Sequence, residues 1–346
     1  MSPAGNRLVG LLCKTGIVLV PAVVVTGVRV TSQKDKRSGI QFSRTITVHA
    51  HAAKVSFDST MTCIDTRPRS WGIWQVTQLD AANRQGAGFN KELRCYSPVN
   101  PASVHPNGYR VMFGDTNNPF FSLDSKNKLA VAHYRYKVGK IGADNVAGWI
   151  ATVDGTAGSV FVQRFKAFPG ARYPDKASIE FWMNGVGTFY CFTNKVVAKD
   201  DPLEMPFLVE SEVLSPIATL KPGESYSFQN EWAVARIGGN YPVLDCTEAG
   251  VTCEPLVVTI GKDTLRITGR FGVFYDGKAT LQDEKGAELM THAVSPATPL
   301  VLDFTMPVTT RVGRIAVAIT DAAGVSRGEL AHAKVEKATS EERGGT

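Results

Sequence analysis

The sequence predicts an all-β protein built from antiparallel sheets packed face to face. Its 346 residues include 32 glycines and 18 prolines, which separate short runs rich in Val, Ile, Thr and Phe. Short β-branched and aromatic runs bounded by turn residues are typical of strands. Amphipathic helical patterns are scarce, which argues against alternating strands and helices. Since 43% of the residues are hydrophobic and only 20% are charged, the chain has ample material for a core.

Charge and targeting signals narrow the class of protein. The net charge of +6 is spread along the chain, and its densest basic clusters, at 34–37 and 67–69, are short and lie in turn-like sequence. We therefore expect no nucleic acid partner. Residues 8–25 are apolar but interrupted by Lys14 and Pro21, so no membrane span is expected. The same segment has weak signal-peptide character without a clear cleavage site, and a periplasmic or extracellular location is slightly favoured over a cytoplasmic one.

The six cysteines indicate neither a metal site nor a fixed disulfide pattern. Cys246 and Cys253 flank a hairpin-like segment and are close enough in sequence to be bonded. Because no oxidising compartment is established, the bonded and free states both stay open. No cysteine or histidine cluster has zinc-site spacing, so we predict no metal and no cofactor.

The first strands carry an arginine and two tryptophans. Residues 39–47 alternate as a strand in which Arg44 interrupts an apolar face, either at the rim of the core or directed into a pocket. Residues 71–79, WGIWQVTQL, place Trp71 and Gln75 on one strand face. An aromatic ring beside an amide is how proteins hold sugars, so Arg44, Trp71 and Gln75 are candidate substrate-binding residues. Ordinary core tryptophan is the alternative.

A basic strand face is expected further along the chain. Residues 129–138, LAVAHYRYKV, are predicted to form one strand with His133, Arg135 and Lys137 on the same face. These groups would be solvated or would line a polar cleft opposite carboxylates. Residues 139–147 are interpreted as a glycine-punctuated loop without phosphate-loop spacing. Further strands are expected at 54–63, 109–113, 148–153, 160–165 and 178–184.

The stretch from 207 to 232 is the most informative part of the chain. If 208–214 is extended, its period of two puts Glu210 and Glu212 on one face. Carboxylates on a buried wall are costly unless something pairs with them, which makes this wall the first candidate for chemistry. The alternative is an edge strand with its charged face in water.

The predicted strands become shorter after about residue 238. Residues 237–338 are predicted to form a small immunoglobulin-like β-sandwich behind a first domain of residues 1–236, with 339–346 as a disordered tail. We expect that residues 240–338 can be removed without unfolding the first domain. Short strands are expected at 256–260, 264–267, 272–275, 279–282, 300–304 and 316–319.

Four segments in order resemble an uncharacterised bacterial family of the galactose-mutarotase-like superfamily. They are GIQFSR, WGIWQVTQL, YKVGKIG followed by GWIA, and VESEVLSP with LKPGES and NEW, and together they span residues 38–232. The resemblance implies an antiparallel supersandwich with a carbohydrate site on its concave face, here with incomplete N-terminal strands. In mutarotases a glutamate near the last strands acts as general base and a histidine protonates the ring oxygen. Glu210 matches the base best, with Glu212 on the same face.

This chain departs from the mutarotase pattern at the acid. The Asn-His pair of mutarotases has no counterpart in residues 71–79, which contain no histidine. His133, from a different strand, is then the candidate acid. A second carboxylate at Glu212 would raise the pKa of one member of the Glu210 and Glu212 pair toward neutrality, as a general base requires.

Three functions stay open. The leading hypothesis is a carbohydrate-interacting protein of mutarotase-like fold. If it is an enzyme, we expect a sugar epimerase that uses Glu210 as its general base. The alternative is a non-catalytic glycan-binding or structural β-sandwich protein. The third is a polysaccharide lyase acting on uronic acids, in which Arg44, Arg135 or Lys137 would neutralise the acid group. The expected partner is a carbohydrate ligand.

Overall fold

The predicted all-β architecture is confirmed by the computed structural model, which describes residues 27–191, 194–307 and 312–337. The apolar segment at 8–25 and the expected disordered tail at 339–346 lie outside these residues. Nearly all regular structure in them is strand, and the short 3-10 turn η1 (Pro174–Lys176) is their one helical element. None of the described helices has the length and hydropathy needed to cross a bilayer.

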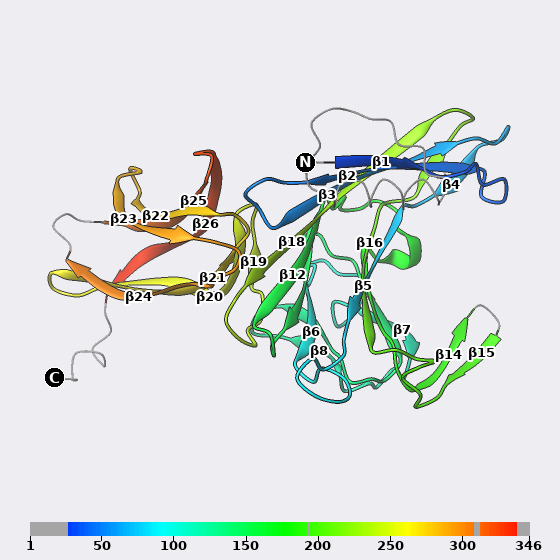
Figure 1. Ribbon diagram of the computed structural model, residues 1–346, viewed down its shortest axis with the longest axis horizontal. Helices are drawn as coiled ribbons and strands as arrows, with labels where there is room; N and C mark the ends of the chain where they lie inside the picture. Colours follow the sequence, from blue (N-terminus) through cyan, green and yellow to red (C-terminus); the bar gives the residue numbers. More distant parts are fainter. Residues whose placement is uncertain (1–26, 192–193, 308–311, 338–346) are drawn as a thin grey trace, which may run out of the picture.

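The larger part of the molecule is a sandwich of two antiparallel sheets (Figure 1). A core of fully buried side chains, among them Met61, Ile141 and Phe181, fills the space between them. The first sheet has nine strands in the order β1 (Gly27–Thr31), β2 (Ile40–Val48), β3 (Lys54–Cys63), β18 (Ser225–Arg236), β12 (Ser159–Phe165), β11 (Trp149–Asp154), β6 (Leu93–Pro98), β9 (Leu129–His133) and β8 (Phe121–Asp124). The second has five, in the order β5 (Trp74–Asp80), β16 (Leu208–Leu214), β13 (Ile179–Met183), β10 (Gly139–Ala143) and β7 (Arg110–Gly114).

Strand β16 has the predicted bounds and the predicted alternation. Val209 and Val213 are buried in the core between the sheets. Ser211 points the same way, since its oxygens accept hydrogen bonds from the Gln163 side chain of the facing sheet. The intervening Glu210 and Glu212 therefore lie on the outer face of the five-stranded sheet.

The predicted strand at 71–79 is divided in two. The short strand β4 (Arg69–Trp71) pairs with β17 (Ala218–Leu220), and β5 starts only at Trp74. At the break the backbone packs closely against Ser215, because a Cβ on Gly72 would lie 3.1 Å from the Ser215 carbonyl oxygen. Trp71 is thereby separated from the regular alternation of β5.

The predicted strand at 129–138 is too long. Strand β9 ends at His133, and Tyr136 has a φ of +50°, which lies in the left-handed region and not in the extended one. The chain turns there, so His133, Arg135 and Lys137 do not share a strand face. In the segment expected as a glycine-punctuated loop, residues 139–143 instead form strand β10, in which glycines allow close packing, while 144–147 lie in the connection to β11. A Cβ on Gly142 would lie 2.8 Å from the Met112 sulfur.

A two-stranded hairpin stands beside the five-stranded sheet. It consists of β14 (Gly187–Cys191) and β15 (Asn194–Ala198), and it extends from the molecule next to β7 (Figure 1). The Phe189 ring of β14 packs edge-on against the Trp182 ring of β13 at 5.0 Å, which holds the hairpin against the sheet.

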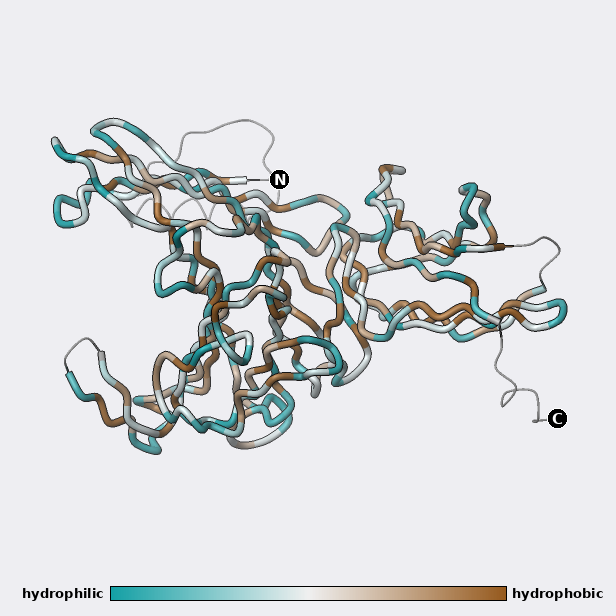
Figure 2. The backbone as a smooth tube through the Cα atoms, turned by 180° about the vertical axis from the view of Figure 1, so that it is seen from behind, coloured by the Kyte–Doolittle hydropathy of each residue, from teal (hydrophilic) through white to brown (hydrophobic). Residues whose placement is uncertain are grey.

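The C-terminal part is a second, smaller β-sandwich, as predicted. Two groups of strands lie in two layers around a separate core and are joined by the parallel pair β20–β26 (Figure 1). The strands of this sandwich contain many hydrophobic residues, and its outer loops are mostly hydrophilic (Figure 2). The order is β23 (Glu288–Val294), β22 (Gly277–Asp283), β25 (Arg314–Asp321), β26 (Ser326–Lys337), β20 (Gly250–Ile260), β21 (Thr264–Val273) and β24 (Leu300–Pro307), with β19 (Asp245–Cys246) on β20.

The two sandwiches share a hydrophobic cluster. Ala233 and Trp149 of the nine-stranded sheet are buried together with Val251 and Phe274 of the smaller sandwich. The backbone N–H of Ala53 also donates to the Phe274 carbonyl at 2.9 Å. A shared core changes the expectation for the domain boundary, because removing the smaller sandwich would expose this cluster to water.

A buried ionic group reinforces the junction. The Lys54 ammonium lies 3.0 Å from a Glu231 carboxylate oxygen and 2.5 Å from one of Glu248. It also donates to the Tyr275 hydroxyl at 2.7 Å. Burial acts to raise the pKa of Glu248, but hydrogen bonds from Lys54 and Tyr275 outweigh it and lower that pKa to about 2.

The cysteine pair that the sequence left open is not bonded. Cys246 and Cys253 are both free in the structure, on β19 and β20 near the shared cluster.

Candidate functional site

Three charged side chains meet on the outer face of the five-stranded sheet. Glu212 of β16 lies opposite Glu180 of β13 in the strand register, and Lys140 comes from the next strand, β10. The Lys140 Nζ atom is 2.9 Å from Glu212 Oε2 and 2.5 Å from Glu180 Oε2. The exposed fractions of the three side chains are 6% for Lys140, 4% for Glu180 and 0% for Glu212. We call Glu180, Lys140 and Glu212 the carboxylate–lysine cluster.

The cluster holds more carboxylate than cation. Burial raises the pKa of Glu212 to about 8, and the nearby Glu180 adds to the effect while Lys140 opposes it. Burial acts to lower the pKa of Lys140, but Glu212 and Glu180 outweigh it and raise that pKa. Glu212 Oε1 has no hydrogen-bond partner among the described residues. A proton on Glu212 therefore balances the cluster, leaving one carboxylate to face one ammonium.

Trp74 covers the cluster from the side of β5. Its Nε1–H donates to Glu212 Oε2 at 2.6 Å, and the Lys140 Nζ atom lies 4.8 Å from its ring centroid. Trp74 is nevertheless 54% exposed. A large apolar ring is thus held in orientation while part of its surface meets solvent.

A cleft of about 1170 Å³ adjoins the cluster. Trp71 is 46% exposed in its wall and is held by a hydrogen bond from its Nε1–H to the Ser38 carbonyl at 3.0 Å. Arg110 and Asp175 form an ion pair of 3.5 Å at the margin of the cleft. The side chains that line it also include Trp74, Phe113, Lys140, Glu180, Phe189 and Tyr190.

Two of the residues predicted from the sequence belong to this site. Trp71 lines the cleft, and Glu212 lies beneath Trp74 in the cluster. Glu210 is on the same face two residues away, where it accepts a hydrogen bond of 2.9 Å from the Gln78 amide, but it is not among the lining residues.

Arg44 and Gln75, the other predicted substrate-binding residues of the first strands, do not line this cleft. Gln75 is buried between the two sheets, and its amide donates to the Ser59 hydroxyl at 3.2 Å. The Arg44 Nε–H donates to the same hydroxyl at 2.9 Å, and burial lowers the pKa of the guanidinium. Both side chains therefore contribute to polar packing inside the sandwich.

The three residues of the predicted basic face have other partners. His133 bonds to the Lys91 carbonyl at 2.8 Å, and burial lowers the pKa of its imidazole. Arg135 donates to the same carbonyl, while Lys137 pairs with Asp115 at 3.3 Å. None of these hydrogen bonds and ion pairs in the described part of the chain involves a glutamate of β16, so we do not carry His133 forward as the acid.

Sequence reasoning missed Lys140 and Glu180. Lys140 stands in GKIGA, whose two glycines resemble a loop, although the residues around the lysine are apolar. Glu180 stands inside the apolar run SIEFWM, where a single carboxylate in a predicted strand was the available signal. That the two residues meet Glu212 depends on which strands pair, and local sequence does not specify pairing.

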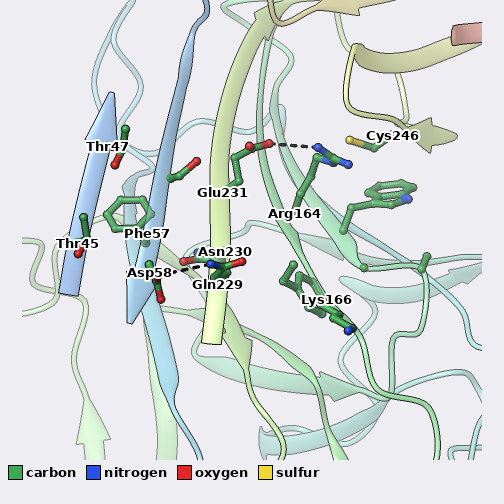
Figure 3. Close-up of a pocket in the computed structure, with 15 residues that line it drawn as sticks. Thr45, Thr47, Phe57, Asp58, Arg164, Lys166, Gln229, Asn230, Glu231 and Cys246 are labelled. Carbon is green, nitrogen blue, oxygen red and sulfur yellow. Dashed lines mark hydrogen bonds and ion pairs between the residues drawn. The ribbon is translucent and has the colours of Figure 1, made fainter. Parts of the chain in front are cut away.

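A second cavity, of about 490 Å³, lies on the outer face of the nine-stranded sheet (Figure 3). In its wall Arg164 and Glu231 point toward each other, 3.2 Å apart, and the Gln229 amide donates to Asp58 at 3.4 Å. Arg164 also pairs with Glu248 of the smaller sandwich. These side chains satisfy one another and strengthen the junction, and we assign the cavity no ligand.

Comparisons with known proteins give one family match. A family model described as "Domain of unknown function (DUF4380)" matches residues 14–235, which end within the last strand of the larger sandwich. This confirms the resemblance to an uncharacterised family that the sequence indicates. No curated protein matches the chain.

Solved structures of low similarity also align with it. A galactose mutarotase-like protein from Lactobacillus casei has 11% identity and a TM-score of 0.41, covering 63% of this chain and 72% of that one. A galactose mutarotase related enzyme from Lactobacillus acidophilus has 9% identity and a TM-score of 0.37, covering 62% of this chain and 70% of that one. These proteins are of the kind that the sequence resemblance indicates, but at these TM-scores the likeness carries no argument about activity.

Proposed function

The chain belongs to the family described as Domain of unknown function (DUF4380), and we propose that its larger sandwich binds a carbohydrate in the cleft beside the carboxylate–lysine cluster. The observation that carries the proposal is that Trp74 is held in place and is still exposed. Buried Glu212 accepts a hydrogen bond from the indole N–H and Lys140 lies over the ring, yet Trp74 is 54% exposed and lines the cleft. An aromatic ring held rigid and left open to solvent is a surface prepared for a ligand.

The surroundings of Trp74 suit a sugar. The apolar C–H face of a pyranose packs on an aromatic ring, while its hydroxyl groups need polar partners around the edge. Trp71 supplies a second ring, and Arg110, Asp175 and Glu180 supply donors and acceptors in the same cleft. Because the rings are already held, binding costs little side-chain ordering.

A sugar epimerase is the second candidate, and the position of the cluster favours it. Burial raises the pKa of Glu212 to about 8, so Glu212 holds its proton near neutral pH and is not itself the base. Glu180 lines the cleft and shares the Lys140 ammonium with Glu212. In this proposal Glu180 accepts the anomeric proton and Glu212 is its neutral neighbour. That assignment replaces Glu210, which does not line the cleft.

The binding proposal is tested by titrating the tryptophan fluorescence of the protein with a panel of mono- and oligosaccharides. Trp74→Ala should lower the affinity for any sugar found at least tenfold, which corresponds to about 1.4 kcal/mol. Phe42→Ala is the matched control, because Phe42 is also an exposed aromatic on a strand but does not line the cleft. Equal affinity in wild type and Trp74→Ala, or no binding to any sugar, would overturn the proposal.

The epimerase candidate is tested by polarimetry of freshly dissolved α-anomers. If the assignment holds, Glu180→Gln abolishes enzymatic anomerisation while Glu210→Gln keeps it. The reverse result would return the base to Glu210. No rate above the spontaneous one in wild type would remove the epimerase and leave the binding proposal standing.

A further inference from the structure

The cleft has aromatic walls at both edges of the five-stranded sheet. Trp71 and Trp74 lie at one edge, where β4 and β5 run. Phe113 of β7 and Tyr190 of the β14–β15 hairpin lie at the other. Since β5 and β7 are the outer strands of five, four strand spacings of about 4.8 Å place these edges about 19 Å apart.

The far wall is held by aromatic packing. The Trp182 ring, on the outer face of β13, contacts Phe113 at 5.9 Å and Phe189 at 5.0 Å, both edge-on. Tyr190 next to them is 57% exposed. Each end of the cleft therefore has an exposed ring among its lining residues, Trp74 at one end and Tyr190 at the other, and the polar side chains Lys140 and Glu180 also line the cleft.

The dimensions exceed those of a site for one sugar. Small-molecule sites usually have volumes of about 300–1000 Å³, and this cleft has about 1170 Å³. A single pyranose stacked on Trp74 would not reach the β7 edge, about 19 Å away. Two separated stacking surfaces fit a ligand in which several rings follow one another.

The charges of the lining residues indicate a neutral ligand. The described lining residues contain two cations, Arg110 and Lys140, and each already faces a carboxylate within 4 Å. The carboxylates Asp175 and Glu180 balance them. A uronate would bring a further negative charge and find no cation in the described lining that lacks a partner, so its desolvation would not be offset.

We propose that the cleft binds a neutral oligosaccharide laid across the strands from Trp74 to Tyr190, an inference that rests on the proposed carbohydrate binding. The bound oligosaccharide crosses β16, β13 and β10 above the carboxylate–lysine cluster. The two aromatic ends stack on different sugar rings of one ligand. Affinity then depends on the length of the chain, and each end contributes only when the ligand is long enough to reach it.

The test uses neutral β-1,4-linked gluco-, manno- and xylo-oligosaccharides of one to six units, with oligogalacturonides of equal length as acidic probes. Calorimetric titration should show an affinity that rises at least tenfold from the monosaccharide to the tetrasaccharide in one neutral series. Tyr190→Ala should remove most of this gain and leave the affinity for the monosaccharide unchanged. Phe42→Ala should leave both unchanged.

The outcomes separate this inference from the function on which it rests. A monosaccharide bound as tightly as the tetrasaccharide, or a Tyr190→Ala variant with the full gain, would overturn the extended site but keep carbohydrate binding. Tighter binding of oligogalacturonides than of every neutral series would overturn the neutral ligand. No binding of any probe by the folded protein would overturn carbohydrate binding itself.

Discussion

Replacing Glu212 by glutamine should change how the stability of the protein depends on pH. The carboxyl is fully buried beneath Trp74, and burial raises its pKa from 4.5 to about 8. Between these values the folded protein keeps a proton on Glu212 that the unfolded chain releases. Each unit of pKa difference corresponds to about 1.4 kcal/mol, so the full effect is on the order of 5 kcal/mol.

The sign follows from the direction of the shift. Because the folded pKa lies above the unfolded one, the contribution of Glu212 is fully present below about pH 4.5 and is lost as the pH rises through about 8. Over this range the free energy of unfolding of wild type should fall by about 1.4 kcal/mol per pH unit relative to a variant without this proton. Lys140 does not interfere, since its pKa is raised from 10.5 and its contribution is lost only above that value.

The assay is urea unfolding followed by tryptophan fluorescence at half-unit steps from pH 5 to 8.5. Titrating groups outside the carboxylate–lysine cluster act equally in wild type and Glu212→Gln, so the difference between the two curves reports the titration of the cluster. We expect the variant to be the less stable protein at pH 5 and to gain steadily on wild type as the pH rises. Glu210→Gln, which removes a carboxylate from the same strand face, should run parallel to wild type. Parallel curves for Glu212→Gln, within about 0.5 kcal/mol, would refute a neutral Glu212.

Three further expectations concern the junction and the turns. Lys54→Met removes the buried ammonium from Glu231 and Glu248, which keep Arg164 as a partner, and should lower the free energy of unfolding by about 1–3 kcal/mol in urea titrations at pH 7; an unchanged midpoint would contradict it. Gly185→Ala should lower the melting temperature by about 5 °C or more, because Gly185 has a φ of +156° and a Cβ there would lie 2.2 Å from the Tyr136 carbonyl carbon. Gly86→Ala, whose added Cβ would lie 3.3 Å from its nearest neighbour, should not. Removal of 240–338 should give aggregated protein in size-exclusion chromatography, and a soluble folded fragment would show that the shared cluster is dispensable.

Period-two alternation predicted most of what local sequence controls. The bounds of β3 and β16 agree with the expected strands, and the outward direction of Glu212 follows from the buried valines on either side of Ser211. Alternation failed at 129–138, where the residues suit a strand but the backbone turns at Tyr136. A positive φ at a tyrosine has no signature in a single sequence, because surrounding tertiary contacts impose it.

The candidate site shows the same division between local and non-local information. One carboxylate could be found, since Glu212 stands in an apolar strand. Its partner Lys140 could not, because glycines that allow tight packing in a strand look the same in sequence as glycines that form a loop. The cluster exists only through the order of β16, β13 and β10, and that order joins strands far apart in the chain.

The position of β18 in the nine-stranded sheet has a consequence for how the protein reaches its native state. This strand lies between β3 and β12, and the Thr60 and Ser227 hydroxyls that bond across β3 and β18 are 167 residues apart. On the ribosome, β1–β3 and the group of β6, β8, β9, β11 and β12 must wait with open inner edges until residues 225–236 emerge. Strand β26 closes the smaller sandwich in the same way, between β25 and β20. Such late, long-range closure slows folding and leaves strand edges able to pair with other nascent chains, so we expect the yield of native protein to respond strongly to the rate of synthesis and to chaperones.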